Sequence, residues 1–155
     1  MIPILIFILS TLLLTAADQW VKHWAATVLQ PLGTIPILDG LLRFAYVENR
    51  GAAFGLLQNG RWFFVPLTLV FVGLLLFYYI RLPKERKYWA VRVPLILICA
   101  GAVGNFIDRL INGYVVDMLE FLFISFPVFN LADILLVSGT FLLAFIWLFV
   151  IKEPA

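Results

Sequence analysis

The sequence has little charge. Charged residues occupy 13% of its 155 positions and hydrophobic residues 64%, which leaves too little polar surface to coat a water-soluble globule. The formal net charge is only +2 and the basic residues are not arranged as a groove, which argues against a nucleic-acid partner. The composition therefore predicts a membrane protein.

Cysteine and histidine each occur once. Cys99 lies in an apolar stretch, so a disulfide or cysteine cluster within one chain is excluded and a packing thiol is expected. His23 is interpreted as a surface residue, and without further histidines the three-ligand set of a catalytic zinc is missing, so no metal is predicted. The Gly-x-Ser-x-Gly elbow of serine hydrolases is absent. Gly101 and Gly104 fall in an apolar stretch, where small residues serve helix packing rather than nucleotide binding.

Long apolar blocks are what the sequence does contain. They cover residues 2–20, 63–80, 88–110 and 131–151. About 20 helical residues cross a hydrocarbon core of roughly 30 Å, and barrel-type alternation is absent. We therefore predict one integral membrane domain, residues 1–155, of the all-α class with four transmembrane helices. The first block could instead be a cleaved secretory signal ending at Ala16 and Ala17, although no Lys or Arg precedes its apolar part.

Positive charge is densest between the second and third blocks. The basic residues there are Arg81, Lys84, Arg86, Lys87 and Arg92. Short loops rich in Lys and Arg stay on the cytoplasmic side, so this loop and both termini are predicted to be inside, and Lys152 agrees. Residues 21–62 and 111–130 then form outer excursions.

The two excursions differ in pattern. The first contains many turn residues, and its run 41–47 mixes β-branched, aromatic and aliphatic residues, so a small β-rich periplasmic platform is expected between helices 1 and 2. In the second, the apolar run 119–126 is too short to span and is expected at the interface.

Polar residues of three blocks gather on one side of the membrane in this topology. They are Asp18, Lys22, Asn105, Asp108, Arg109, Asn130 and Asp133. An ionisable group in the bilayer costs about 2.5–3.5 kcal/mol on insertion scales, so it needs a partner or a purpose. Residues three or four apart share a helix face, as Asp18 does with Lys22 and Asn130 with Asp133. A polar site at the outer helix ends is predicted.

Two aspartates offer a specific chemistry. Asp117 follows Val115 and Val116, and such apolar flanks raise a carboxyl pKa. If Asp117 and Asp133 meet around one water, they must share a proton, and general acid–base hydrolysis of an amide becomes possible. The residue inventory leaves two other readings open: pairing with Lys22 and Arg109 to tie a structural or scaffold protein together, or lining the ion path of a small non-enzymatic carrier or channel.

Five ordered segments carry a resemblance. They are Asp18 with Lys22, NRGAAFG at 49–55, GNFIDR at 104–109, GYVVD at 113–117 and FNLAD at 129–133. In these the chain resembles the bacterial lipoprotein signal peptidases, also called signal peptidase II, from residue 18 to residue 133. The resemblance implies an aspartyl protease of the bacterial inner membrane that removes the signal peptide of prolipoproteins, cutting just before a cysteine that carries a diacylglyceryl group.

The resemblance also implies roles for individual residues. Asp117 and Asp133 are implied as the catalytic pair. A supporting or substrate-binding shell is implied for Asp18, Lys22, Asn49, Gly51, Asn105, Asp108, Arg109 and Asn130. Phe54 and Trp62 are expected to clamp the peptide above the membrane. The partners implied are the lipid-modified signal peptide, membrane lipids and the cyclic peptide antibiotic globomycin as an inhibitor, with no metal or organic cofactor.

Overall fold

The computed structural model describes residues 2–51 and 57–151. Four stretches of helix in these ranges are long and apolar enough to cross a membrane: Ile2–Leu32, Arg61–Arg81, Arg86–Ile111 and Leu131–Val150. The predicted blocks match three of them to within about two residues. Five residues named above lie outside the described ranges: Ala52, Ala53, Phe54, Gly55 and Lys152.

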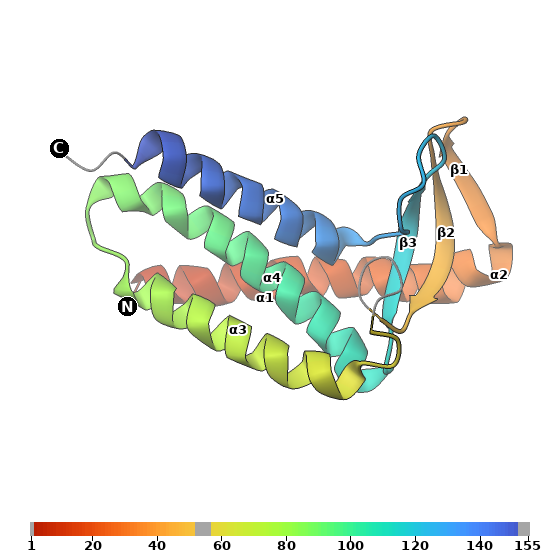
Figure 1. The fold of residues 1–155 in the computed structure, drawn as a ribbon, viewed down its shortest axis with the longest axis horizontal. Helices are drawn as coiled ribbons and strands as arrows, with labels where there is room; N and C mark the ends of the chain where they lie inside the picture. The colour runs from red at the N-terminus through yellow and green to blue at the C-terminus, as the bar shows by residue number, and fades with distance from the viewer. Residues whose placement is uncertain (1, 52–56, 152–155) are drawn as a thin grey trace.

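The bundle is organised around one central helix. Its helices are α1 (Ile2–Trp24), α3 (Arg61–Arg81), α4 (Trp89–Ile111) and α5 (Leu131–Phe145), with a short 3-10 turn η3 (Arg86–Tyr88) before α4 and a π-helical segment η4 (Ile146–Val150) after α5. Helix α4 packs against α1, α3 and α5 (Figure 1). It is buried along most of its length, whereas the other three helices expose apolar side chains. Exposed apolar faces of this kind suit a lipid environment.

Glycines bring α4 and α5 close together. A Cβ added at Gly101 would collide with the carbonyl oxygen of Ala132 and lie 2.9 Å from the nitrogen of Leu136. A Cβ at Gly139 would lie 2.9 Å from Cγ1 of Ile98. Small residues permit such close backbone approach between membrane helices. This packing fixes the start of α5 beside the last turns of α4.

The first helix is longer than the sequence suggested. The first excursion, expected to begin at residue 21, begins at Gly33, because α1 continues through a π-helical segment η1 (Ala25–Leu29) into α2 (Gln30–Leu32). Ala25 and Leu29, four residues apart on one face, are fully buried against Val116 and Met118. The extension therefore supports the sheet.

A small sheet covers one end of the bundle. It consists of β1 (Thr34–Leu38), β2 (Leu42–Asn49) and β3 (Val115–Phe121), antiparallel in the order β1-β2-β3. The first two strands confirm the β-rich platform, whereas the third comes from the second excursion and takes in residues 119–121 of the run expected at the interface. Figure 1 shows the sheet at the end of the bundle opposite the α3–α4 connection.

Candidate active site

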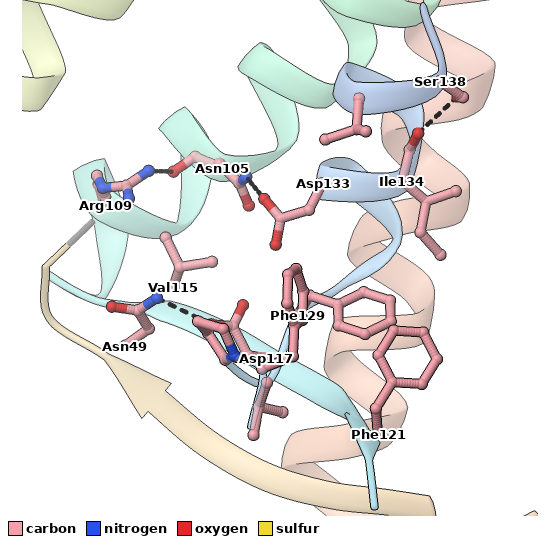
Figure 2. Close-up of a pocket in the computed structure, with 14 residues that line it drawn as sticks. Asn49, Asn105, Arg109, Val115, Asp117, Phe121, Phe129, Asp133, Ile134 and Ser138 are labelled. Carbon is pink, nitrogen blue, oxygen red and sulfur yellow. Dashed lines mark hydrogen bonds between the residues drawn. The ribbon is translucent and has the colours of Figure 1, made fainter. Parts of the chain in front are cut away.

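The predicted polar residues meet where the sheet joins the bundle. Asn105 and Arg109 lie in the last turns of α4, Asp133 in the first turn of α5, and Asp117 in β3. Asn49 ends β2. In Figure 2 the side chains of Asp117 and Asp133 point from the strand and the helix toward the same space. Chain segments up to 84 residues apart thus build one site.

Helix α5 begins with a motif that fixes Asp133. The backbone nitrogen of Asp133 donates to Oδ1 of the N-cap residue Asn130 at 2.9 Å, and the backbone nitrogen of Asn130 donates to Oδ2 of Asp133 at 3.2 Å. This reciprocal capping box satisfies two otherwise unpaired donors of the first turn. Nδ2 of Asn105 donates to Oδ1 of Asp133 at 2.8 Å. Both oxygens of the carboxyl group are therefore held.

Asp117 is held in a similar way from the sheet. Its Oδ2 accepts from Nδ2 of Asn49 at 2.9 Å and its Oδ1 from Nδ2 of Asn130 at 2.6 Å. The Asp117 side chain is 2% exposed. Burial raises the pKa of Asp117, and the negative charge of Asp133 raises it further. The two amide hydrogen bonds lower the pKa, and the net result is a value of about 7.

Neutral amides surround the two carboxyl groups. Asn130 contacts both, through its backbone nitrogen to Asp133 and its side-chain amide to Asp117. Among residues 2–51 and 57–151, no Lys, Arg or His forms an ion pair with either aspartate. The negative charge of Asp133 therefore acts on Asp117 with no ion-pair partner for either group among these residues.

The pair borders a cavity of about 490 Å³. Its polar wall is formed by Asn49, Asn105, Arg109, Asp117 and Asp133. The rest of its lining is mostly apolar and comes from Val115, Phe121, Phe126, Pro127, Val128, Phe129, Ile134, Val137 and Ser138. Figure 2 shows Phe121 and Phe129 beside the aspartates and Ile134 on the α5 side. A second cavity of about 510 Å³ shares Asn49 and Asp117 and is lined by the more polar Glu48, Arg50 and Ser125.

A second buried cluster lies behind the cavity. Nζ of Lys22 is 3.0 Å from Oδ2 of Asp18 and 3.1 Å from Oδ2 of Asp108, and it also donates to Oδ1 of Asn105 at 2.9 Å. The other oxygen of Asp18 accepts from the backbone nitrogen of Ala132 at 2.9 Å. Asp18, Lys22 and Asp108 do not line the cavity; they orient Asn105 and the start of α5.

Sequence reasoning missed Gln19. Its Nε2 donates to Oδ2 of Asp18 at 3.2 Å, to the carbonyl oxygen of Gly104 at 3.1 Å and to Oδ1 of Asp108 at 3.1 Å. The signal was available, because Gln19 is an amide at the end of a long apolar block, next to Asp18 and three residues before Lys22. The apolar cavity wall was also missed.

Arg109 connects the cavity to the segment after β2. One of its terminal nitrogens donates to the carbonyl oxygen of Gly51 at 3.1 Å, and its guanidinium lies 4.8 Å from the ring centroid of Phe64. The backbone nitrogen of Gly51 donates to Oδ1 of Asn49 at 3.0 Å, which orients the amide toward Asp117. Trp62, expected to clamp a substrate, is exposed at the start of α3.

The described part of the chain contains no candidate metal site. No group of three or more His, Cys, Asp or Glu side chains with a metal-binding arrangement occurs there. The chemistry that the described site offers is that of two hydrogen-bonded carboxyl groups facing a partly apolar cavity.

Known proteins resemble the chain over nearly its whole length. The family model of signal peptidase (SPase) II matches residues 10–149. The lipoprotein signal peptidase of Streptococcus thermophilus is 44% identical over 137 residues, 88% of each chain. The lipoprotein signal peptidase of Caldanaerobacter subterraneus is 46% identical, and the match covers 85% of this chain and 88% of the relative. The lipoprotein signal peptidase of Clostridioides difficile is 42% identical, and the match covers 94% of this chain and 96% of the relative.

A solved structure has the same fold. It is a bacterial membrane enzyme determined by the in meso method at 2.3 Å resolution, 30% identical in sequence, and it superposes with a TM-score of 0.85 over 96% of this chain and 93% of its own. Together with the family model and the relatives, this likeness shows that the chain is a multi-pass membrane protein belonging to the signal peptidase II family.

Proposed function

We propose that this chain removes the signal peptide of prolipoproteins by aspartyl chemistry, with Asp117 and Asp133 as the catalytic pair. One observation carries the proposal. The two carboxyl groups face a common cavity from β3 and α5, are joined through Asn130, and form no ion pair with a described cation. Family membership supports prolipoproteins as the substrate.

The pair can hydrolyse an amide without a covalent intermediate. With one proton on the pair, the ionised carboxylate takes a proton from a water molecule, whose oxygen attacks the carbonyl carbon of the peptide bond. The protonated carboxyl gives its proton to the carbonyl oxygen. The tetrahedral species then collapses and the carbon–nitrogen bond breaks. The leaving nitrogen takes up the proton that the first carboxylate removed from water, and a hydroxyl of the tetrahedral species returns a proton to the other carboxylate. The raised pKa of Asp117, about 7, favours its protonated form near neutral pH, as this step requires.

The cavity walls fit a lipidated peptide. The apolar wall continues from the aspartates along α5 through Ile134 and Val137, where the apolar helix of a signal peptide and the diacylglyceryl chains can pack. The more polar second cavity, with Glu48 and Arg50, can receive the chain that follows the cleaved bond. Such a fit supports cleavage just before the lipidated cysteine.

The proposed location is the bacterial inner membrane, with both termini in the cytoplasm and the site and sheet on the outer side. The basic connection between α3 and α4, with Lys84, lies at the bundle end opposite the sheet (Figure 1), as the charge bias of membrane proteins would require. Asp39→Cys and Lys84→Cys, each in a Cys99→Ala background, test it. In intact spheroplasts a membrane-impermeant maleimide should label the first and not the second; the reverse pattern would invert the topology.

The activity is tested with the purified full-length chain in detergent. A diacylglyceryl-modified precursor peptide should be cut before its cysteine, and the same peptide without lipid should be cut far more slowly. We expect globomycin to inhibit by occupying the same cavity. Absence of cleavage by a folded preparation would favour a non-enzymatic carrier instead.

A further inference from the structure

A third cavity lies at the end of the bundle away from the aspartates. Its volume is about 470 Å³, and it is lined by Ile2, Pro3, Lys84, Trp89 and Arg92. These residues come from the start of α1, the connection between α3 and α4, and the first turn of α4. Figure 1 shows these segments at the end of the bundle opposite the sheet. Its lining shares no residue with the proposed active site.

Arg92, a buried cation of this cavity, forms no ion pair among residues 2–51 and 57–151. Its side chain is 7% exposed, and its guanidinium lies between two rings, 4.8 Å from the centroid of Tyr79 and 5.3 Å from that of Trp89. One terminal nitrogen makes a long 3.4 Å contact with the carbonyl oxygen of Tyr79, while Nε is buried without a hydrogen-bond partner. A buried guanidinium calls for an anion.

The protein supplies no such anion in its described part. No carboxylate of residues 2–51 and 57–151 forms an ion pair with Arg92. Glu85, the acidic residue of the α3–α4 connection, pairs instead with Lys87 at 3.4 Å. Lys84, which is exposed, adds a second positive charge to the lining. Arg81, Arg86 and Lys87 make the surrounding connection strongly basic.

The surroundings indicate a ligand at a membrane surface. Trp89 is about half exposed, and amphipathic indole rings favour the level of lipid headgroups. Arginine forks bind phosphate oxygens through two parallel hydrogen bonds, and basic pockets between membrane helices accept anionic headgroups. Exposed Ile2 offers apolar contact beside the charges, as an acyl chain requires.

We propose that this cavity binds the phosphate of an anionic phospholipid, with Arg92 reaching the phosphate from inside and Lys84 from the surface. Trp89 packs beside the headgroup and Ile2 beside an acyl chain. The site ties the starts of α1 and α4 to the α3–α4 connection through a lipid. This inference does not depend on the peptidase proposal.

The test uses the full-length chain in neutral detergent. Phosphatidylglycerol or phosphatidylcholine is titrated in, and bound lipid is counted by native mass spectrometry. The wild type should bind phosphatidylglycerol in preference to phosphatidylcholine. Lys84→Ala and Arg92→Met should each weaken phosphatidylglycerol binding about tenfold, as expected for loss of a charge-assisted contact.

Arg81→Ala is the matched control, because it removes one positive charge from the same connection but does not line the cavity. It should bind phosphatidylglycerol like the wild type. Should Arg92→Met melt early in lipid-free detergent, the exposed Lys84→Ala decides the comparison with Arg81→Ala.

Equal effects of Lys84→Ala and Arg81→Ala would overturn the site, as would equal binding of the two lipids by the wild type. A separate arm adds inorganic phosphate to the lipid-free protein and follows Tm. A rise equal to that given by phosphatidylglycerol would assign the cavity to free phosphate and overturn the lipid proposal.

Discussion

The two buried acidic clusters of this protein lie side by side but are compensated differently. Asp18 and Asp108 share the ammonium of Lys22 and also receive hydrogen bonds from backbone nitrogens. Asp117 and Asp133 receive amide hydrogen bonds and form no ion pair among the described residues. Asn105 contacts both clusters, since it accepts from Lys22 and donates to Asp133.

This comparison distinguishes a structural role for one cluster from a role in proton transfer for the other. A shared cation ties two helices together, because its removal would leave buried charges without a partner. A buried carboxyl held only by neutral amides remains able to gain or lose a proton near neutral pH, as the raised pKa of Asp117 indicates. Lys22 lies behind the cavity, where it holds Asn105 and forms no ion pair with Asp117 or Asp133.

Replacing either aspartate of the pair should have the largest effect. Asp117→Asn and Asp133→Asn should each lower kcat for a lipidated precursor by about 10²–10⁴-fold or more, because one partner in proton transfer is lost. The exposed Asp39→Asn is the matched control and should retain full activity. Precursor cleavage followed by mass spectrometry gives the rates. Near-normal turnover by either variant would remove the pair from the chemistry.

The same Asp117→Asn variant checks the electrostatic contrast. A carboxyl whose pKa rises from 3.8 to about 7 on folding favours the folded state most below its unfolded pKa, and this contribution is lost as pH rises toward 7. Melting curves of the wild type should therefore show Tm falling over that interval, and Asp117→Asn should reduce the fall.

Removing the central cation should cost stability. Lys22→Met leaves Asp18 and Asp108 buried without their shared partner, and we expect a loss of about 3–5 kcal/mol in the free energy of unfolding. Lys87→Met is the control, since its pair with Glu85 is exposed and should be worth at most about 1 kcal/mol. Detergent unfolding curves compare the two variants. Similar curves would mean that the ionic cluster does not hold the bundle.

Much of this contrast could be read from the sequence. Four apolar blocks predict four helices that cross the membrane in alternating directions. This alternation alone places Asp18, Asn105 and Asp133 at one end of the bundle. Helical spacing correctly paired Asp18 with Lys22 and Asn130 with Asp133. The sequence could not predict that Asp108 also pairs with Lys22, or that Asp117 and Asp133 form no ion pair among the described residues, because these contacts join helices that share no sequence pattern.

Long-range pairing accounts for most of what was missed. Strand β3 pairs with β2 of the first excursion, and this pairing sets Asp117 beside Asn49. The two residues are 68 positions apart, so no local pattern predicts the contact. Phe121 and Phe129 carry no recognisable signal as cavity lining in a chain with 15 phenylalanines. Lys22 was interpreted as a helix end, and so the continuation to Leu32 went unrecognised.

Asn130 should show how the amides tune the pair. Asn130→Ser keeps an N-cap acceptor for α5 but removes the donor to Asp117, so kcat/KM should fall about 10–100-fold, the range for hydrogen bonds to charged groups. Losing a donor that lowers the pKa of Asp117 raises that pKa further, and the alkaline limb of the pH–rate profile should move to higher pH. Asn130→Ala should give the same profile with an additional loss of Tm. A lower rate with an unmoved limb would make Asn130 purely structural.

The smallest effect concerns how tightly the ionic cluster is packed. A Cβ at Gly104 would collide with Oδ2 of Asp18 and lie 3.2 Å from Cβ of Ala132. Gly104→Ala should therefore push the Asp18 carboxylate away from Lys22 and destabilise the protein by about 1–3 kcal/mol, the usual cost of overpacking. Gly73→Ala makes the same change in α3, where nothing lies within 4 Å, and should be neutral or slightly stabilising because alanine favours helix. Equal Tm values for the two variants would show that the ionic cluster, like the cavity beside it, has room to adjust.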